Sequence, residues 1–539
     1  MTLYRRGANA VAVVAFGTAA ALAVHHAVSI RDYGWTDLRL ICTAAFAWLT
    51  FTSIMPYLHR DVPLPTAGSH AAALLDRLFV SVIVPAHNED PVMFRAFLDS
   101  LVAQTRMPNR VHVVENGNPG YTPTLLPVIR QWQAQGGRAA RIEVRYDFNP
   151  VGDKRHAQAV AFRQDDEADI VITIDSDVKL APTAIASGLA PFRNARTACV
   201  TGMLVGLNTN ANLLTRLIEP SFVCAYLNGR AAHSMLRSVT VNSGALSFYR
   251  AAIWHKYLDH YLNFTIAGRR MKSGDDAMMT RYSLLEGEAV FQSGCWGYTL
   301  HPESLGQLTS QRVRWWRSLF WGGVFVLRTF RPTRFVWWST AWTLLSMTWM
   351  TVAMPFVLIV RPTVTGSVPW MVLAWLVGIT YVARARYLTI TRPGEPFGKH
   401  LGLWLLAPLS AVLNLYTGFV LGYVGMVTCL RDGWSSRSTV LTYRPESATE
   451  LPVPPQPLYD GDAPTAVLDL RDLRSRLIPA QRPTGVPVEE METRELYPVI
   501  APPAAVGERR VRLPRNAGPR DVRGPGRVAA RPGVGQPGG

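Results

Sequence analysis

The chain alternates between long uncharged apolar runs and stretches in which polar and β-branched residues mix. Five runs contain no Asp, Glu, Lys or Arg and cover positions 8–28, 40–58, 335–360, 362–383 and 401–430. Each is close to or above the roughly 20 residues that a helix needs to cross a bilayer. The pattern predicts two transmembrane helices within 1–60 and a C-terminal transmembrane region over 335–430.

Basic residues beside these runs predict their orientation. Arg5, Arg6 and Arg60 flank the first two runs, and such charges favour the cytoplasmic side of a membrane. The region that follows is then cytoplasmic, and the chain is an integral, multi-pass protein of the plasma membrane. Two alternatives stay open. The first run could be a cleaved signal peptide, and the last could be one tilted span or a hairpin broken near Pro408 or Asn414.

The region 78–334 has the composition of a soluble α/β domain. Helical stretches alternate with short β-branched segments, which read FVSVIVPA, RVHVVEN, RIEVRYDF and DIVITIDSD. Such alternation predicts a mainly parallel sheet with helices on both faces. The expected architecture is an α/β domain between two groups of transmembrane helices.

Composition agrees with a membrane protein and weighs against nucleic-acid binding. The chain carries a formal net charge of +17, 48% hydrophobic residues and 16 tryptophans, as expected of a membrane protein with a basic cytoplasmic side. Much of the charge falls beside the apolar runs or in segment 445–539, and therefore does not outline a nucleic-acid footprint. That segment is rich in Pro, Gly and Arg and is predicted to be a disordered tail.

The sharpest chemical signal is the acidic pair Asp175 and Asp177. A run of apolar β-formers delivers both residues at the carboxyl end of a strand, where open α/β sheets bind their ligands. Two carboxylates in this spacing suit a hard divalent cation that also holds a diphosphate. An acidic turn that caps the next helix is the simpler interpretation of this motif taken alone.

Polar residues near two further strand ends reduce the weight of that simpler interpretation. They are His87, Asn88, Glu89 and Asp90 after the first strand, Glu115 and Asn116 after the second, and Lys154 with Arg155 before the acidic pair. Because the carboxyl ends of parallel strands meet at one edge of a sheet, these groups could surround one nucleotide.

A second acidic pair, Asp275 and Asp276, follows Ser273 and Gly274, which can start a helix. The helix dipole keeps a carboxylate in the first turn ionised, and a general base needs this at neutral pH. Helix N-capping accounts for one aspartate and leaves the other to be explained.

The stretch SQRVRWWRSLF places three more candidates on one face of a helix. Arg314 and Trp315 lie three and four positions after Gln311, a spacing that brings side chains together on a helix. Arginine can pair with a leaving phosphate, and tryptophan offers an apolar face to a sugar ring. An aromatic and basic collar at a membrane boundary is the alternative.

Taken in order, six motifs resemble those of the processive family-2 glycosyltransferases, most closely the hyaluronan synthases, with chitin and cellulose synthases as relatives. The motifs are VSVIVPAHNED, GDKRHAQA, DSD, NSGALSFYR, SGDDAMMT and QRVRW. The match runs over about 79–323 and resumes at RDGWSSRS. This resemblance implies a GT-A fold, a UDP-sugar donor, a growing polysaccharide acceptor and Mg²⁺ or Mn²⁺ as cofactor.

The resemblance also implies a role for each candidate. The nucleotide would be bound by Glu89, Glu115, Lys154 and Asp175, and the metal by Asp177 with Asp175. Asp276 would be the base, with Asp275, Gln311, Arg314 and Trp315 completing the catalytic group. Asn242, Ser243 and Gly244 would bind the acceptor, together with Trp315. Trp434 and Arg437, in a gating loop at 431–444, would close over the diphosphate.

Two positions depart from the family's pattern, since relatives usually carry an aspartate where Glu115 stands, and WSSR replaces W-G-T-R. The implied reaction is a single inverting displacement that yields a β-linked polymer, exported through the protein's own helices. A chitin-like or glucan synthase is the alternative within the superfamily. The alternative from another class is a non-catalytic sugar-binding membrane protein or a transporter.

Overall fold

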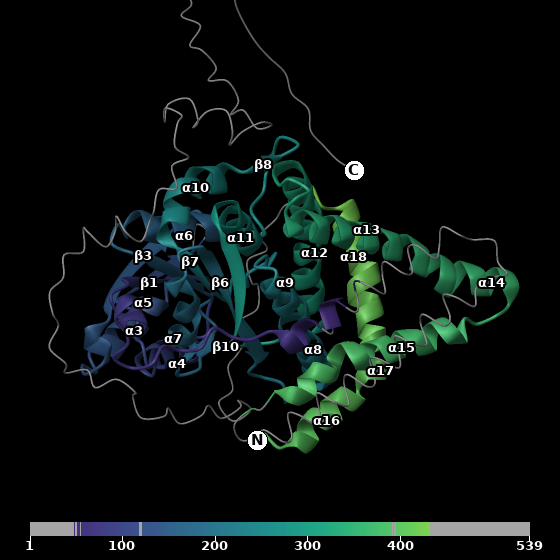
Figure 1. The fold of residues 1–539 in the computed structure, drawn as a ribbon, viewed down its shortest axis with the longest axis horizontal. Coiled ribbons are helices and arrows are strands. Elements are labelled where there is room, and N and C mark those ends of the chain that lie inside the picture. Colours follow the sequence, from purple (N-terminus) through teal and green to yellow (C-terminus); the bar gives the residue numbers. More distant parts are fainter. Residues whose placement is uncertain are drawn as a thin grey trace, which may run out of the picture. The chain divides into compact units, whose positions relative to one another are not determined.

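The computed structural model describes residues 48, 51–53, 55–117, 121–390, 392 and 395–431, and Figure 1 shows their arrangement. Within them, eight strands form one sheet in the order β3-β2-β1-β4-β7-β6-β10-β5. The strands are β1 Val80–Ala86, β2 Arg110–Asn116, β3 Glu143–Asn149, β4 Ile170–Ile174, β5 Lys179–Leu180, β6 Thr197–Gly206, β7 Leu246–Arg250 and β10 Glu288–Thr299.

The sheet is mainly parallel, which confirms the expectation for the α/β domain. Strands β3, β2, β1 and β4 run parallel to one another, and so do β6 and β10. Strand β7 is antiparallel to both of its neighbours, β4 and β6, and the short β5 is antiparallel to β10. The carboxyl ends of β1, β2 and β4 therefore meet at one edge of the sheet.

Helices between the strands cover the sheet. They are α3 His70–Asp76, α4 Pro91–Val102, α5 Leu125–Gln133, η2 Ala139–Arg141, α6 Lys154–Arg163, α7 Ala184–Leu189, η3 Ala190–Arg193, α8 Leu213–Cys224, η4 Ala225–Arg230, α9 Ala231–Met235, α10 Ala251–Asn263 and α11 Asp275–Glu286. A small hairpin, β8 Thr265–Ile266 and β9 Arg269–Arg270, lies between α10 and α11. Helix α6 packs on β1 and β2, so its first residue lies beside their carboxyl ends.

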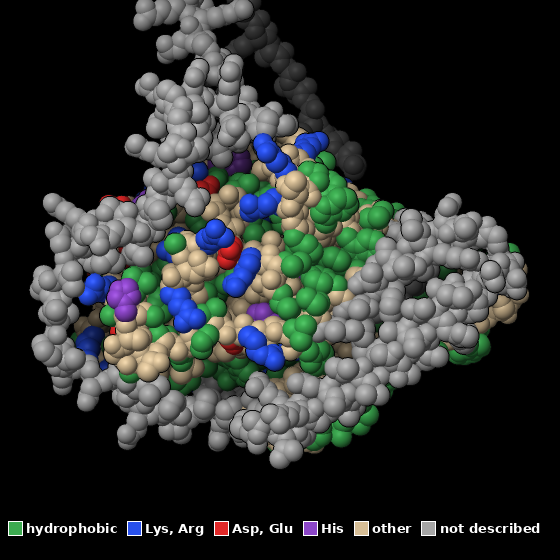
Figure 2. Space-filling model, viewed as in Figure 1, with side chains coloured by type: hydrophobic (Ala, Val, Ile, Leu, Met, Phe, Trp, Pro, Cys, Tyr) green, Lys and Arg blue, Asp and Glu red, His purple; other side chains and the backbone are tan. Residues whose placement is uncertain are grey.

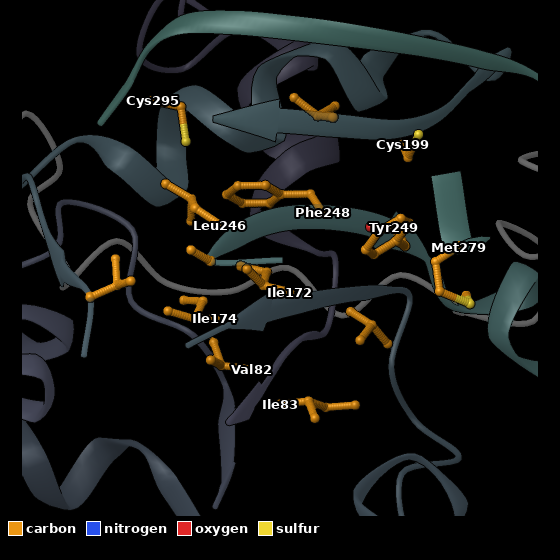
Figure 3. Close-up of a cluster of buried hydrophobic side chains, with 14 of the residues drawn as sticks. Val82, Ile83, Ile172, Ile174, Cys199, Leu246, Phe248, Tyr249, Met279 and Cys295 are labelled. Atoms are coloured by element: carbon orange, nitrogen blue, oxygen red, sulfur yellow. The ribbon is translucent and has the colours of Figure 1, made fainter. Parts of the chain in front are cut away.

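The core runs along β1, β4 and β7, and Figure 3 shows Val82, Ile172 and Phe248 from these strands packed together. Every residue of β1 and β4 is buried, and each large apolar side chain contributes about 1.5–3 kcal/mol when fully buried. Gly188 of α7 gives Phe248 room, because a Cβ at this position would lie 2.2 Å from the ring. The end of β4, and with it Asp175, is thus carried by a closely packed scaffold.

A second group of helices follows the sheet domain along the chain. They are α12 Leu305–Thr329, α13 Phe335–Pro355, η5 Phe356–Val360, α14 Arg361–Thr365, α15 Trp370–Arg384, η6 Ala385–Thr389, α16 Phe397–Leu405, α17 Ala407–Asn414, η7 Leu415–Val420 and α18 Leu421–Val427. Helix α12 packs against both α13 and α18, and the three lie side by side in Figure 1.

The boundary between the third and fourth apolar runs lies later than predicted. Helical structure continues from α13 through η5 and α14 to Thr365, so Arg361 and Pro362 sit within it. The helix ends at Gly366, whose φ of 68° is left-handed and whose N–H donates to Pro362 O at 2.9 Å. Glycine favours such a C-terminal cap because it has no Cβ.

The last apolar run contains the helix best suited to cross a membrane. Among the described residues, Ala407–Val427 is the one helix that is long and apolar enough, with 21 residues. It joins α17, η7 and α18 and follows α16 after a break at Leu406. The break is thus close to Pro408, whereas Asn414 lies inside the helix. The run 8–28 lies outside the described residues, and only part of 40–58 is described, as helix.

Candidate active site

The loops after β1 and β2 are tied together at the edge of the sheet. His87 Nδ1 lies 2.7 Å from the backbone oxygen of Asn116. Asn88 adopts a φ of 52°, a left-handed conformation that asparagine tolerates better than most residues. Asp90 caps the N-terminus of α4 with its side chain, and Glu89 lies in the same turn. The two strand-end loops that carry the predicted nucleotide residues are therefore neighbours.

Glu115 is fully buried at the end of β2 and accepts four strong hydrogen bonds. The hydroxyls of Tyr121 and Tyr146 donate at 2.8 Å each, and the amides of Thr124 and Leu125 donate at 2.8 and 3.2 Å. These two amides open α5, so the carboxylate also stabilises a helix N-terminus. A carboxylate offers about four lone-pair sites, and these donors use them. Glu115 thus holds the strand-end loops together.

Aromatic rings stack beside this carboxylate. The ring centroids of His87 and Tyr121 are 5.4 Å apart, and those of Tyr121 and Phe148 are 6.3 Å apart with nearly parallel planes at 6°. Phe148 remains 39% exposed, so one face of the stack is open to a planar ligand. Sequence reasoning missed Tyr121, because it lies in a loop with no motif of its own.

Lys154 connects the two acidic pairs. Its Nζ lies 2.8 Å from Asp175 Oδ1 and 3.1 Å from Asp275 Oδ2. Burial by itself lowers the pKa of a lysine, but the charges of Asp175 and Asp275 outweigh it and raise the pKa of Lys154 above its ordinary value. The ammonium therefore stays charged. Residues about 120 positions apart in the sequence meet at this one cation.

The second acidic pair opens α11, as predicted. Gly274 is the N-cap with a left-handed φ of 65°, and neither aspartate is needed as a cap. Asp276 Oδ1 accepts from the amide of Ala277 at 2.7 Å and Oδ2 from the amide of Gly244 at 3.2 Å. The carboxylate that the resemblance assigns as base is thus held by two backbone amides.

The environment shifts the pKa values of Asp275 and Asp276 in opposite directions. Burial and the neighbouring charge of Asp275 raise the pKa of Asp276, with Lys154 opposing the shift. For Asp275 burial also acts to raise the pKa, but the charge and hydrogen bond of Lys154 prevail and lower it. The two neighbouring carboxyl groups thus differ in pKa, a difference that is typical of catalytic pairs.

The segment Asn242 to Gly244 lies against the start of α11. The amide of Asn242 donates to Thr280 Oγ1 at 2.9 Å, and Thr280 in turn donates to the backbone oxygen of Asp276. A Cβ on Gly244 would lie 3.3 Å from both Lys154 Nζ and Asp276 Cβ. Glycine at this position therefore lets the backbone approach the base and the cation closely.

Asp175 and Asp177 follow β4 directly, as predicted. The side chain of Asp175 is 32% exposed, whereas Asp177 is buried. The described residues contain no group of three or more His, Cys, Asp or Glu placed to hold a metal by themselves. Two carboxylates suit a hard cation that also takes oxygen ligands from a bound diphosphate. The donor set therefore fits Mg²⁺ or Mn²⁺ shared with a nucleotide.

Helix α12 packs on the start of α11. A Cβ on Gly274 would lie 2.8 Å from Ser318 Cβ and 2.9 Å from the Trp321 ring, so the two helices touch next to the acidic pair. Arg314 and Trp315 lie about one turn before Ser318 along α12, and one turn is about 5.4 Å. Trp315 is 40% exposed, with the guanidinium of Arg312 4.5 Å from its ring centroid.

Helix α12 also packs on η7 and α18. Trp316 Nε1 donates to Thr417 O at 2.7 Å, and Arg317 Nε donates to Thr428 Oγ1 at 2.9 Å. Beyond α18, Leu430 O accepts from Arg269 Nη1 of β9 at 3.3 Å. The chain thus leaves α18 beside the hairpin that leads into α11. Trp434 and Arg437 follow a few residues later and lie outside the described residues.

Arg281 is a residue of this junction that sequence reasoning missed. It lies in α11, is buried, and places its guanidinium 5.6 Å from the Trp321 ring centroid. Within the described part of the chain its Nη1 has no hydrogen-bond partner. Burial lowers the pKa of Arg281 to about 10, with the charge of Asp276 opposing the shift. An arginine in a helix has no motif that would have revealed it.

The chain is similar to known glycosyltransferases. Residues 77–318 match a family model described as "Glycosyltransferase like family 2". The chain is 27% identical over 365 residues to the hyaluronan synthase of Streptococcus pyogenes serotype M1, covering 68% of this chain and 84% of that protein. It is 31% identical over 268 residues to an N-acetylglucosaminyltransferase of Sinorhizobium fredii (strain NBRC 101917 / NGR234), covering 49% and 62%.

Two solved structures align with this chain at low similarity. The mannosyltransferase from Pyrobaculum calidifontis in complex with GDP-Man and Mn²⁺ aligns with a TM-score of 0.41 and 17% identity, over 69% of this chain and 97% of that one. S. aureus TarS 1–349 in complex with UDP-GlcNAc aligns with a TM-score of 0.36 and 15% identity, over 66% and 93%.

Proposed function

This chain is a family-2 glycosyltransferase related to hyaluronan synthases, and from that premise we propose that it polymerises a β-linked polysaccharide from UDP-sugars and exports the product through its own membrane helices. The single observation that carries this proposal is the Lys154 ammonium, held between Asp175 and Asp275. It brings the residues proposed for the nucleotide next to the residues proposed for proton removal.

On the donor side, the exposed Phe148 ring and the stacked Tyr121 supply a flat apolar surface for a base, with Glu89 and Glu115 beside it. Lys154 and Asp175 lie at the same sheet edge and would bind the diphosphate. Asp177 and Asp175 would hold Mg²⁺ or Mn²⁺. The ion would neutralise charge on the leaving diphosphate.

The proposed reaction is one inverting displacement. Asp276 takes the proton of a hydroxyl on the terminal sugar of the acceptor, and that oxygen bonds to the anomeric carbon of the donor. The bond from this carbon to the diphosphate oxygen breaks, and UDP leaves with the bonding electron pair. Lys154 and Arg314 stabilise the departing charge. Inversion converts an α-linked donor into a β-linked product.

On the acceptor side, the backbone of Asn242, Ser243 and Gly244 lies beside Asp276, within reach of the attacking sugar. Trp315 offers an exposed ring for that sugar to stack on, as aromatic faces commonly do with apolar surfaces. Gln311 and Arg314 share its helix face. Attack from this side places the acceptor between α11 and α12, next to the helices proposed to lie in the membrane.

The distribution of exposed apolar side chains supports embedding in a bilayer. Large apolar residues stand exposed along the C-terminal helices, among them Trp338 at 59%, Leu345 at 63%, Ile359 at 62%, Trp370 at 71% and Val412 at 65%. Figure 2 shows hydrophobic side chains gathered over α13 and α18. Soluble proteins rarely expose so many large apolar side chains together. We therefore assign the chain to the plasma membrane as a multi-pass protein, with the sheet domain cytoplasmic.

The gating assignment of 431–444 is part of the same proposal. The contact of Arg269 with Leu430 starts this segment beside the hairpin that precedes Asp275. Trp434 and Arg437 follow Leu430 by four and seven residues in the sequence, and we propose that they close over a bound diphosphate.

Assay of the full-length protein in lipid nanodiscs tests this function. Single UDP-sugars and pairs of them are supplied with Mg²⁺ or Mn²⁺, UDP release is measured, and the product is digested with linkage-specific hydrolases. We expect release of UDP and a product sensitive to one class of β-glycan hydrolase. Absence of UDP release with every donor and pair would contradict the proposal.

A chitin-like synthase is the second candidate, because the relatives include N-acetylglucosaminyltransferases. Polymer formed from UDP-GlcNAc alone and cleaved by chitinase would favour it. A requirement for two donors would favour a hyaluronan-like product. The transporter alternative is weaker, since the five apolar runs contain no Asp or Glu of the kind that ion-coupled carriers place within the membrane.

A further inference from the structure

Three segments that are distant in the sequence meet at the Lys154 ammonium. Lys154 opens α6, Asp175 follows β4, and Asp275 opens α11. The side chains of Lys154 and Asp275 are each 15% exposed, and that of Asp175 is 32% exposed. These ion pairs are therefore partly withdrawn from water and are stronger than pairs on an open surface.

Asp276 already has the contacts expected of a base, so Asp275 requires an explanation of its own. Asp275 Oδ2 is buried and faces the Lys154 ammonium. Its charge is compensated by the 3.1 Å ion pair with Lys154. An ionised carboxylate is costly to bury without such a partner, so this pair accounts for the presence of Asp275.

The backbone around the pair is fixed by the neighbouring residue. Arg155 is buried and donates from Nη2 to Ser273 O at 2.7 Å and from Nη1 to Tyr261 O at 2.8 Å. The residue that follows Lys154 in the sequence thus binds the backbone two residues before Asp275. The distance between the starts of α6 and α11 is set independently of the ion pair, and an Asp275 variant has a scaffold to keep its fold.

We propose that Asp275 is a positioning residue that holds the Lys154 ammonium in place for the donor diphosphate, and that it is not a second base. This inference rests on the proposed function. An ammonium has three N–H donors. Asp175 and Asp275 direct two of them, which leaves the third to point at a phosphate oxygen. Without Asp275 the flexible four-carbon stem of Lys154 is held from one side only.

A double-mutant cycle on UDP binding tests the proposal, with the full-length protein, UDP and Mn²⁺ in nanodiscs. The variants are Asp275→Asn, Lys154→Met and the two together, with Asp276→Asn as the matched control. We expect Asp275→Asn to weaken UDP binding about 10-fold, in the range of a lost charge-assisted hydrogen bond. The same change in the Lys154→Met background has less than about a 2-fold effect, because the cation that it positions is gone.

The control and a conservative variant separate positioning from a general loss of structure. Asp276→Asn leaves UDP binding within about 2-fold, since its carboxylate accepts hydrogen bonds from two backbone amides, whereas Lys154 forms its ion pairs with Asp175 and Asp275. Lys154→Arg keeps a cation, so the dependence on Asp275 persists in that background. Equal weakening by Asp275→Asn with and without Lys154, or no weakening at all, would overturn the inference while leaving the enzyme function standing. A wild-type chain that binds no UDP would overturn both.

Discussion

At the strand ends, Glu115 accepts five hydrogen bonds and Lys154 bridges two carboxylates. By contrast, Gln311 and Arg314 on α12 make no side-chain hydrogen bond within the described part of the chain. We call the first group, Glu115, Lys154 and Asp175, the donor side. The exposed face of α12 formed by Gln311, Arg314 and Trp315 is the acceptor side. The two sides are positioned by different kinds of interaction.

The donor side is preorganised by polar contacts, and the acceptor side by helix packing. Charges fixed before the ligand arrives stabilise a transition state without reorganisation at the moment of reaction. On α12 the helix itself is fixed, because Trp316 fits against Gly425, where a Cβ would lie 2.3 Å from Trp316 Cβ. Among the described residues, the side chains of Gln311 and Arg314 make no hydrogen bond, and Trp315 contacts the guanidinium of Arg312.

The largest effect is expected at the boundary of the two sides. Asp276→Asn should reduce polymerisation by about 10²- to 10⁴-fold, the usual cost of removing a general base. UDP binding should change little, because the donor-side contacts remain. Turnover and UDP affinity are measured on the same preparation. Turnover near that of the wild type would remove Asp276 from the role of base.

The metal assignment is tested with Asp177→Ala. UDP affinity should fall about 10- to 100-fold in Mn²⁺, as when a metal site is disturbed, and change little in EDTA. Asp166→Ala, an exposed carboxylate on the same domain, is the control. Equal loss in Mn²⁺ and EDTA would show that Asp177 supports the fold and not an ion.

The polar framework of the donor side is tested with Glu115→Gln. The amide can no longer accept from all four donors, so the free energy of unfolding should fall by about 2 kcal/mol. Glu143→Gln is the control, since that side chain is 45% exposed and its ion pairs with Arg110 and Arg145 are worth little. Thermal unfolding in nanodiscs measures both. If Glu115→Gln unfolds at the same temperature as the wild type and loses only UDP affinity, the carboxylate contacts the nucleotide directly.

The sequence predicted the positions of site residues within their own strand or helix. It did not predict contacts between residues that are distant in the sequence. Asp175 lies at a strand end because a β-branched run stops before it, and Asp276 lies in a first helical turn because Gly274 precedes it. Nothing local shows that Lys154 reaches Asp275, because three elements must first pack. The helix end at Gly366 was not predicted. The apolar run was expected to end at the charged Arg361, whereas the helix ends at Gly366 because glycine can adopt the left-handed conformation of the C-terminal cap.

The acceptor side is tested with Trp315→Ala. Removing an exposed stacking ring should lower polymer synthesis about 10-fold, since ring stacking contributes about 0.5–1.5 kcal/mol beyond burial. UDP affinity should stay unchanged, because α12 keeps its packing through Trp316. Trp338→Ala, on the exposed face of α13, is the matched control and should leave synthesis as it is. A comparable loss from both variants would assign the effect to membrane insertion.

The smallest expected effect is a shift in the pH profile of turnover. It tests whether the charge of Asp275, which pairs with Lys154 of the donor side, also acts on the base Asp276. Asp276 acts when deprotonated, and burial together with the charge of Asp275 places its pKa above the 3.8 of a free aspartate. Turnover should therefore fall as the pH drops through this raised value, earlier than for an exposed carboxylate. Asp275→Asn removes the adjacent negative charge and leaves Lys154 to act on Asp276 alone.

Both consequences of Asp275→Asn lower the pKa of Asp276, so the acid limb of kcat/KM should move to lower pH while burial keeps it above the ordinary value. Asp275→Glu keeps the charge and should leave the limb in place. The pH profile of kcat/KM for the UDP-sugar is measured for the three proteins. An acid limb that is the same in Asp275→Asn and wild type would mean that the charge of Asp275 does not affect the pKa of Asp276. The electrostatic influence of the donor side would then not extend beyond Lys154.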